Sequence, residues 1–274
     1  MLPHFYLEYF DKKAKLIFGT FSTPDTSGRV EGVKEAIAQW DIEALTKSDF
    51  QQTIQAHLDT ADVMLFIHGY WSKYAYFSRF HQHAFGGVFS ERSVKPNLIE
   101  LIWQSDTLWY RHSWHKAAEK GAQIGHIIHW LSEIYDQKMN LLCHSMGGKF
   151  FEGILTHFEA IKKPIFDNII LYSVDLEAHI FDTPFRHISN IAQNVSIFYH
   201  NHDKTLGIAQ VFQRKKRLGV VGDMTNNLPE NVTSVNMTAI SNNIDRSRHS
   251  LFWTSKEVQH KVRTVLDKSF VQVF

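Results

Sequence analysis

Short, uninterrupted apolar runs recur along this chain, and they constrain its fold more than any other feature. The clearest is Val63-Met64-Leu65-Phe66-Ile67, which ends abruptly at His68-Gly69. A run of this length without polar alternation is typical of a strand that is buried on both faces of a sheet. Comparable runs occupy residues 98–103, 140–143, 169–174 and 195–199, with a weaker one at 232–237.

Segments with helical spacing separate these runs. Apolar residues recur every three or four positions within residues 117–135, and again at Phe151, Ile154 and Phe158. Residues 206–218, closed by Gly219, and residues 257–268 are two further predicted helices. Strands that alternate with helices require crossover connections between parallel neighbours. We therefore expect an α/β fold with a mostly parallel central sheet and helices on both faces.

The N-terminal part of the chain follows a different pattern. Two apolar-aromatic runs, Leu7–Phe10 and Lys15–Phe21, flank a polar turn and predict an antiparallel hairpin. Two helices are predicted next, around Val33–Trp40 and Phe50–Leu58. Because no repeat or low-complexity linker divides the chain, we predict a single domain over residues 1–274.

Composition excludes several classes of protein. The chain has 274 residues, 44% of them hydrophobic, and its net charge of +1 gives no electrostatic reason to expect a nucleic acid partner. Its one cysteine, Cys143, excludes an internal disulfide framework and a cysteine-rich zinc site. No segment approaches the roughly 20 apolar residues of a membrane span. The N-terminus lacks the pattern of a signal peptide, so we expect a cytoplasmic protein, with its oligomeric state left open.

A serine stands between a predicted buried strand and a predicted helix, in Cys143-His144-Ser145-Met146-Gly147-Gly148. A serine on so tight a turn adopts a strained backbone conformation, and the residues two positions away must be small. Gly147 and Cys143 both meet this requirement. Ser145 is therefore a candidate nucleophile, and the alternative is a serine that merely caps the helix.

A second segment, His68-Gly69-Tyr70, ends the first buried strand. Enzymes with a nucleophile elbow place one wall of the oxyanion hole at this position. The backbone N–H groups of Tyr70 and Met146 would then be the two donors, the second from the residue after the nucleophile. The alternative is that Gly69 only turns the chain.

A serine hydroxyl needs a base to accept its proton, and the base needs an orienting carboxylate. With such an elbow the chain order is serine, acid, histidine. His249 lies in a loop after the last predicted strand and directly before the final helix, whereas His157 and His260 fall inside helices. We therefore predict His249 as the base.

Two carboxylates compete for the role of the acid. Asp203 follows the run at 195–199, and Asp175 ends the run at 169–174, so both lie at carboxyl ends of predicted parallel strands. Asp203 stands one strand before the histidine loop, which is the commoner arrangement and makes it the preferred acid. Asp175 is the alternative acid, or else it caps the next turn near Glu177.

These motifs resemble those of a bacterial family of α/β-hydrolases of unknown function, whose members carry an HGY oxyanion segment and an HSMG elbow. The similarity extends to Trp103-Gln104-Ser105 and Asp203-Lys204-Thr205-Leu206, and it spans roughly residues 60 to 265. Cys143 and Gln104 depart from the family pattern, which has a smaller residue and a proline there. The resemblance implies the α/β-hydrolase fold and the triad, and it implies no substrate.

We therefore predict a serine hydrolase that cleaves an ester-like bond of a small molecule through an acyl-enzyme, with no cofactor. No metal is expected, because His200 and His202 alternate on an extended segment without a third partner of clear spacing. The alternative is a catalytically idle hydrolase-fold protein that serves as a binding or scaffold module.

Two further sequence features have both a functional and a structural interpretation. The run Arg214-Lys215-Lys216-Arg217 could bind phosphates, but a solvent-exposed last turn that complements the helix dipole is favoured. Aromatic residues follow two of the buried runs and could either line an apolar pocket or pack in the core. These aromatic residues are Trp71, Tyr74, Tyr76, Phe77, Trp103, Trp109, Tyr110 and Trp114.

Overall fold

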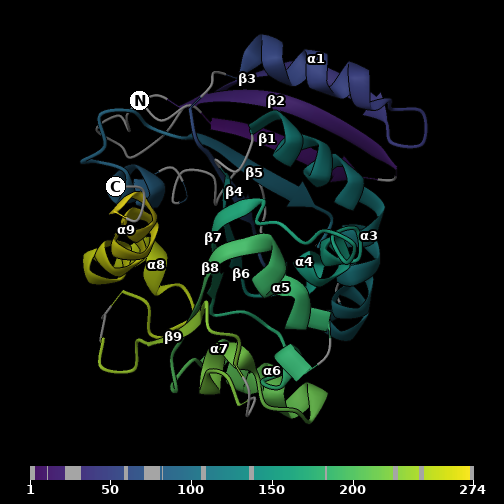
Figure 1. Cartoon of the computed structure of the whole chain (residues 1–274). Coiled ribbons are helices and arrows are strands. Elements are labelled where there is room, and N and C mark those ends of the chain that lie inside the picture. Colours follow the sequence, from purple (N-terminus) through teal and green to yellow (C-terminus); the bar gives the residue numbers. More distant parts are fainter. Residues whose placement is uncertain are drawn as a thin grey trace.

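The computed structural model is built around one mixed sheet (Figure 1). It describes the chain except residues 1–3, 11, 22–31, 59–60, 71–80, 82, 106–108, 136–138, 183, 225–227, 241–243 and 272–274. In the described residues the sheet has nine strands in the order β3-β2-β1-β5-β4-β6-β7-β8-β9. The strands are β1 (His4–Phe10), β2 (Lys13–Phe21), β3 (Gly32–Asp41), β4 (Val63–Ile67), β5 (Asn97–Trp103), β6 (Met139–His144), β7 (Phe166–Tyr172), β8 (Ala192–Tyr199) and β9 (Val232–Asn236).

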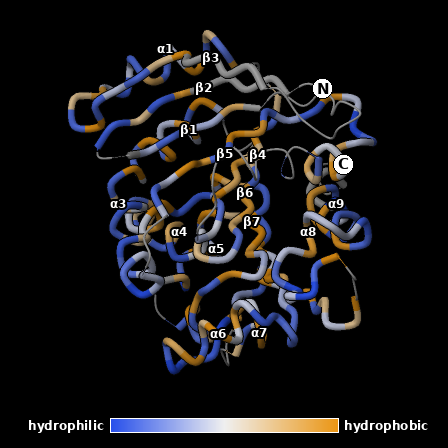
Figure 2. The backbone as a smooth tube through the Cα atoms, turned by 180° about the vertical axis from the view of Figure 1, so that it is seen from behind, coloured by the Kyte–Doolittle hydropathy of each residue, from blue (hydrophilic) through white to orange (hydrophobic). Residues whose placement is uncertain are grey.

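The pairing confirms the predicted fold class. From β1 through β5, β4, β6, β7 and β8 to β9, each strand pairs in parallel with its neighbour. Among the described strands, the antiparallel pairs are β1 with β2 and β2 with β3, and β1 with β2 is the hairpin that the sequence predicts. The side chains of β4, β5 and β6 are all buried, as expected of strands covered on both faces. Figure 2 shows hydrophobic positions concentrated in these central strands.

The prediction of a helix around Val33–Trp40 is wrong, because this segment forms the edge strand β3. The pairing with β2 steps from Leu16–Ala38 to Ile17–Ala36, so Ile37 is an extra residue at a bulge. A bulge interrupts the strict alternation of the two faces of a strand. The apolar residues of β3 therefore recur at intervals that imitate helical spacing.

Helices cover both faces of the sheet (Figure 1). Their bounds are α1 (Lys47–His57), α3 (Tyr110–Tyr135), α4 (Gly147–Leu155), α5 (Ile188–Ile191), α6 (Lys204–Gln213), α7 (Leu218–Val221), α8 (Leu251–Thr254) and α9 (Lys256–Val271), with 3₁₀ turns at Ile180–Asp182 and Pro184–His187. One hydrophobic cluster joins α1, α3 and α4 to one face. A second joins α8, α9 and residues 84–89 to the other face. Among the helices that the structure describes, none has the length and hydropathy needed to cross a bilayer.

The helix predicted over residues 206–218 is shorter than expected. It ends at Gln213 because Arg214 takes the left-handed conformation, with φ 55°, and Gly219 lies inside the next short helix, α7. The chain turns between them so that Arg217 enters the interior, where its side chain is fully buried.

Candidate active site

The carboxyl ends of three parallel strands meet at one edge of the sheet, and the predicted site residues follow them. His68-Gly69-Tyr70 follows β4, Ser145 follows β6, and Asp203 comes shortly after β8. His249 lies in the loop before α8. Functional groups collect at this edge in open α/β sheets because the crossover connections leave a crevice there.

The turn at Ser145 has the strained geometry predicted for an elbow. Ser145 has a φ of 56°, in the left-handed region that a residue with a Cβ atom rarely occupies. Its N–H donates to the Tyr172 carbonyl at 3.3 Å, and its own carbonyl accepts from the Asp175 N–H at 2.8 Å. A Cβ atom at Gly147 would stand only 2.3 Å from the Ile67 carbonyl oxygen. Glycine is therefore required at this position for α4 to start against β4.

Gly69 lies directly against Ser145, since a Cβ atom there would stand 2.6 Å from the Ser145 Cβ. The preceding His68 is held on both ring nitrogens: Nδ1 donates to the Gly69 carbonyl at 2.7 Å, and Nε2 accepts the Trp103 backbone N–H at 3.3 Å. Burial lowers the His68 pKa to about 4, so this ring is neutral. His68 therefore anchors the HGY segment, with Tyr70 next to the elbow.

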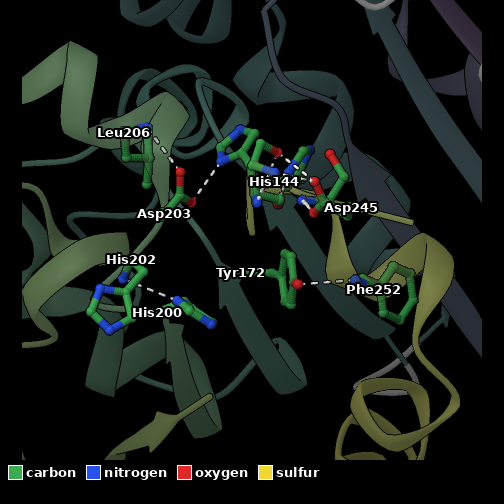
Figure 3. A network of polar contacts seen from close by, with 11 residues as sticks. His144, Tyr172, His200, His202, Asp203, Leu206, Asp245 and Phe252 are labelled. Carbon is green, nitrogen blue, oxygen red and sulfur yellow. Dashed lines mark hydrogen bonds and ion pairs between the residues drawn. The ribbon is translucent and has the colours of Figure 1, made fainter. Parts of the chain in front are cut away.

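The imidazole of His249 is paired with the carboxylate of Asp203, which is labelled in Figure 3. His249 Nδ1 donates to Asp203 Oδ2 at 2.7 Å, and both side chains are buried. The other oxygen, Oδ1, accepts the Leu206 N–H at 2.9 Å and so caps α6. The start of α6 thus fixes the carboxylate that orients the imidazole.

Neighbouring charges set the protonation of His249. Burial alone lowers the pKa of an imidazole, but here the charge of Asp203 and its hydrogen bond act in the opposite direction. The charges of Asp245 and Asp175 add to this effect, and the His249 pKa lies above its usual value of 6.5.

The elbow also holds the backbone of the histidine loop. His144 Nε2 donates to the His249 carbonyl oxygen at 3.1 Å. Burial, followed by the charge of His249, keeps the His144 pKa well below 6.5. Asp245 accepts the N–H groups of Ser247 at 3.0 Å and Ser250 at 2.6 Å, which closes the loop from the other side (Figure 3).

Asp175, the alternative acid, has other partners. Its Oδ2 accepts the Tyr110 hydroxyl, and its Oδ1 lies 3.3 Å from Arg217 Nε in a fully buried ion pair. Burial raises the Asp175 pKa, and the Arg217 charge and the Tyr110 hydrogen bond oppose that rise. The interpretation of residues 214–217 as a solvent-exposed turn is therefore wrong at Arg217. The Asp175 carboxylate, which was alternatively expected to cap the turn near Glu177, instead contacts Tyr110 and Arg217.

The histidines at the end of β8 point away from the paired imidazole. His200 Nδ1 accepts the His202 backbone N–H at 3.0 Å (Figure 3). His200 Nε2 donates to the Ile240 carbonyl at 3.4 Å. The His202 side chain is exposed. Within the described ranges, no three His, Cys, Asp or Glu side chains gather as metal ligands.

Ser145 and His249 line the same cavity, of about 470 Å³. Its walls are mostly apolar, and five residues of α6 contribute to them: Thr205, Leu206, Ile208, Ala209 and Phe212. Of the aromatic residues that the sequence left ambiguous, Tyr110 lines the cavity, whereas Trp103 and Trp114 pack in the core. Tyr70, from the HGY segment, also lines the cavity. Trp71, Tyr74, Tyr76 and Phe77 lie outside the described residues.

Sequence reasoning missed a second histidine–carboxylate pair at this cavity. His81 Nδ1 lies 2.5 Å from Glu100 Oε1, and both side chains are buried. The His81 ring centroid is 4.4 Å from that of Trp253, and both residues line the cavity. The available signal was Glu100 itself, a carboxylate in the middle of the apolar run at 98–103, since a buried charge requires a partner.

Comparison with known proteins gives the family of this chain. The model of one family, described as alpha/beta hydrolase of unknown function (DUF900), matches residues 43–266. A search of curated proteins finds no match. The matched segment covers most of the chain and contains both the elbow and the histidine loop. The chain therefore belongs to this family of α/β-hydrolases of unknown function.

Proposed function

We propose that this protein is a serine hydrolase that cleaves a carboxylic ester, or a related acyl bond, with Ser145, His249 and Asp203 as its triad. One observation carries the proposal: His249, which is paired with buried Asp203, lines the same cavity as a serine on a strained elbow. A serine hydroxyl gains reactivity only beside such an oriented base. The reaction needs only these side chains and water.

In the proposed reaction, Ser145 Oγ attacks the carbonyl carbon while His249 Nε2 takes its proton. Asp203 holds the imidazole with its proton on Nδ1 and stabilises the imidazolium that forms. Collapse of the tetrahedral intermediate transfers that proton to the departing alkoxide and leaves an acyl group on Ser145. Water then attacks the acyl-enzyme by the same steps, and the serine is restored.

The developing oxyanion would be held by the backbone N–H groups of Tyr70 and Met146. Two features support this arrangement. Gly69, which precedes Tyr70, packs on Ser145, and Met146 is the N-cap of α4. The helix N-terminus adds a favourable partial charge. Loss of one such donor typically raises the barrier by about 3 kcal/mol.

Covalent labelling tests this proposal directly. Fluorophosphonates react with an activated serine hydroxyl and leave an adduct on it, because they imitate the tetrahedral intermediate. We expect the native protein to carry one adduct per chain, and peptide mass spectrometry to find it on Ser145. Protein unfolded before labelling serves as the control and should remain unmodified.

An adduct on another serine would disprove the assignment of the nucleophile. A native protein that stays unlabelled and does not hydrolyse any p-nitrophenyl ester in a series of increasing acyl length would instead identify a catalytically idle member of the family.

The pH dependence of kcat/KM is a second expected result. Only neutral His249 can accept a proton, and its pKa is raised above 6.5, so activity should fall as the pH drops through that higher value. The acid limb for a soluble ester should therefore have its midpoint above pH 6.5. Initial rates across about pH 5 to 9 measure it. A midpoint below pH 6.5 would mean that the charges of these carboxylates do not raise the pKa of His249.

A further inference from the structure

Helix α6 presents an apolar face to solvent. Ile208, Val211 and Phe212 are 59%, 77% and 57% exposed, although they occupy little more than one helical turn. Trp109 is 76% exposed and directly precedes Tyr110, a cavity residue. We call Trp109, Ile208, Val211 and Phe212 the rim patch. Large apolar side chains exposed on one helix face and beside a residue that contacts that helix usually mark an interaction surface.

The rim patch is continuous with the candidate active site. Ile208 and Phe212 are one helical turn apart, and both line the cavity that contains Ser145. The Phe212 ring lies 6.2 Å from the Tyr110 ring, which lines the same cavity. A ligand that covers the patch would therefore also cover the cavity mouth. Figure 2 shows hydrophobic positions on α6, at the lower edge of the view.

Exposed cations flank the apolar face. Lys204 begins α6, and Arg214, Lys215 and Lys216 follow its last residue. Lys215 pairs with Glu177 at 2.8 Å, and the carboxylate that caps the helix start, Asp203, is buried against His249. The whole chain carries a net charge of only +1, so this segment concentrates positive charge. A helix that exposes apolar side chains between basic residues at its two ends is suited to an anionic lipid surface, which attracts the cations and receives the apolar side chains.

We propose that the rim patch docks on an anionic lipid surface, and that the substrate is an ester whose apolar acyl chain enters the cavity from that surface. The proposal rests on the proposed hydrolase function for the reaction, but the docking step is independent of it. Insertion of Val211 and Trp109 removes apolar area from water, while Arg214 and Lys216 remain at the level of the anionic headgroups. The apolar cavity wall on α6 then receives the acyl chain without exposing it to water.

Vesicle binding tests the docking. Wild-type protein should co-sediment with vesicles of phosphatidylcholine and phosphatidylglycerol at least about tenfold more tightly than with phosphatidylcholine alone, because the flanking cations contribute only at an anionic surface. A Trp109→Ser/Val211→Ser variant changes residues outside the cavity and should bind anionic vesicles about tenfold more weakly. Val94→Ser is the control. Val94 is 68% exposed, but it precedes the amino end of β5, whereas the candidate site lies at the carboxyl ends of the parallel strands.

The charge contribution has its own variant. Arg214→Gln/Lys216→Gln should weaken binding to the anionic vesicles and leave binding to phosphatidylcholine unchanged. Equal binding of wild type to both kinds of vesicle, or no binding to either, would overturn the proposal. So would a concentration-dependent dimer of the wild type that Trp109→Ser/Val211→Ser abolishes, since the patch would then belong to a second copy of the chain.

Activity separates the docking from the chemistry. On a soluble short-chain p-nitrophenyl ester, Trp109→Ser/Val211→Ser should stay within about twofold of wild type, whereas on a long-chain ester carried in anionic vesicles it should fall about tenfold. If wild type binds anionic vesicles but does not hydrolyse either ester, the hydrolase function fails and the docking stands. If it hydrolyses the soluble ester and does not bind vesicles, the docking fails and the hydrolase function stands.

Discussion

Replacement of Ser145 by alanine is expected to abolish fluorophosphonate labelling and to lower kcat on p-nitrophenyl esters by about a million-fold. The reason is that the substitution removes the attacking oxygen, and the rest of a serine triad has little value without its nucleophile. The variant should still hydrolyse the ester faster than the uncatalysed reaction does, because the amides of Tyr70 and Met146 would still bind the oxyanion.

The same substitution should leave the fold intact. Alanine retains the Cβ atom that already occupies the left-handed turn at φ 56°, and the hydrogen bonds of the turn are made by backbone atoms. The free energy of unfolding should therefore change by about 1 kcal/mol or less. Initial rates and melting curves on the same preparation measure both quantities. A folded Ser145→Ala protein that kept a tenth of the wild-type activity would rule out Ser145 as the nucleophile.

Much of this arrangement could be predicted from the sequence because burial on both faces gives a strand a simple pattern. The run Val63–Ile67 corresponds to β4 residue for residue. The elbow is equally visible, since its requirement for small neighbours leaves few residues possible at Gly147. Where a segment is determined by short-range sterics, local sequence contains the necessary information.

Features that depend on distant partners could not be predicted in this way. The bulge at Ile37 is defined only against β2, and without that pairing the strand resembles a helix. The burial of Arg217 depends on Asp175 and Tyr110, which lie more than forty residues away from it. The contact from His144 to the His249 carbonyl joins residues that are 105 positions apart. A lone polar residue in an apolar run indicates a partner but does not identify it.

Two matched variants at the acidic positions should behave in opposite ways. Asp203→Asn is expected to lower kcat by about 10,000-fold with little change in stability. Asparagine caps a helix as well as aspartate does, so its oxygen can still accept the Leu206 N–H. That orientation turns the amide NH₂ toward His249 Nδ1, which must then act as acceptor. The imidazole proton then lies on Nε2, and a protonated Nε2 cannot accept the proton of the serine.

Asp175→Asn should instead destabilise the protein by about 3 kcal/mol, because it leaves the buried Arg217 without its counter-charge. The activity of the molecules that remain folded should change far less than in Asp203→Asn, since His249 keeps its hydrogen bond to Asp203. Melting temperature and kcat per active site, counted by fluorophosphonate titration, separate the two effects. The opposite result, with a stable Asp175→Asn protein that has lost catalysis and a nearly active Asp203→Asn protein, would assign the acid to the end of β7. The charge that orients the histidine would then come from the end of the neighbouring strand, and Asp203 would serve only to cap α6 through its bond to the Leu206 N–H.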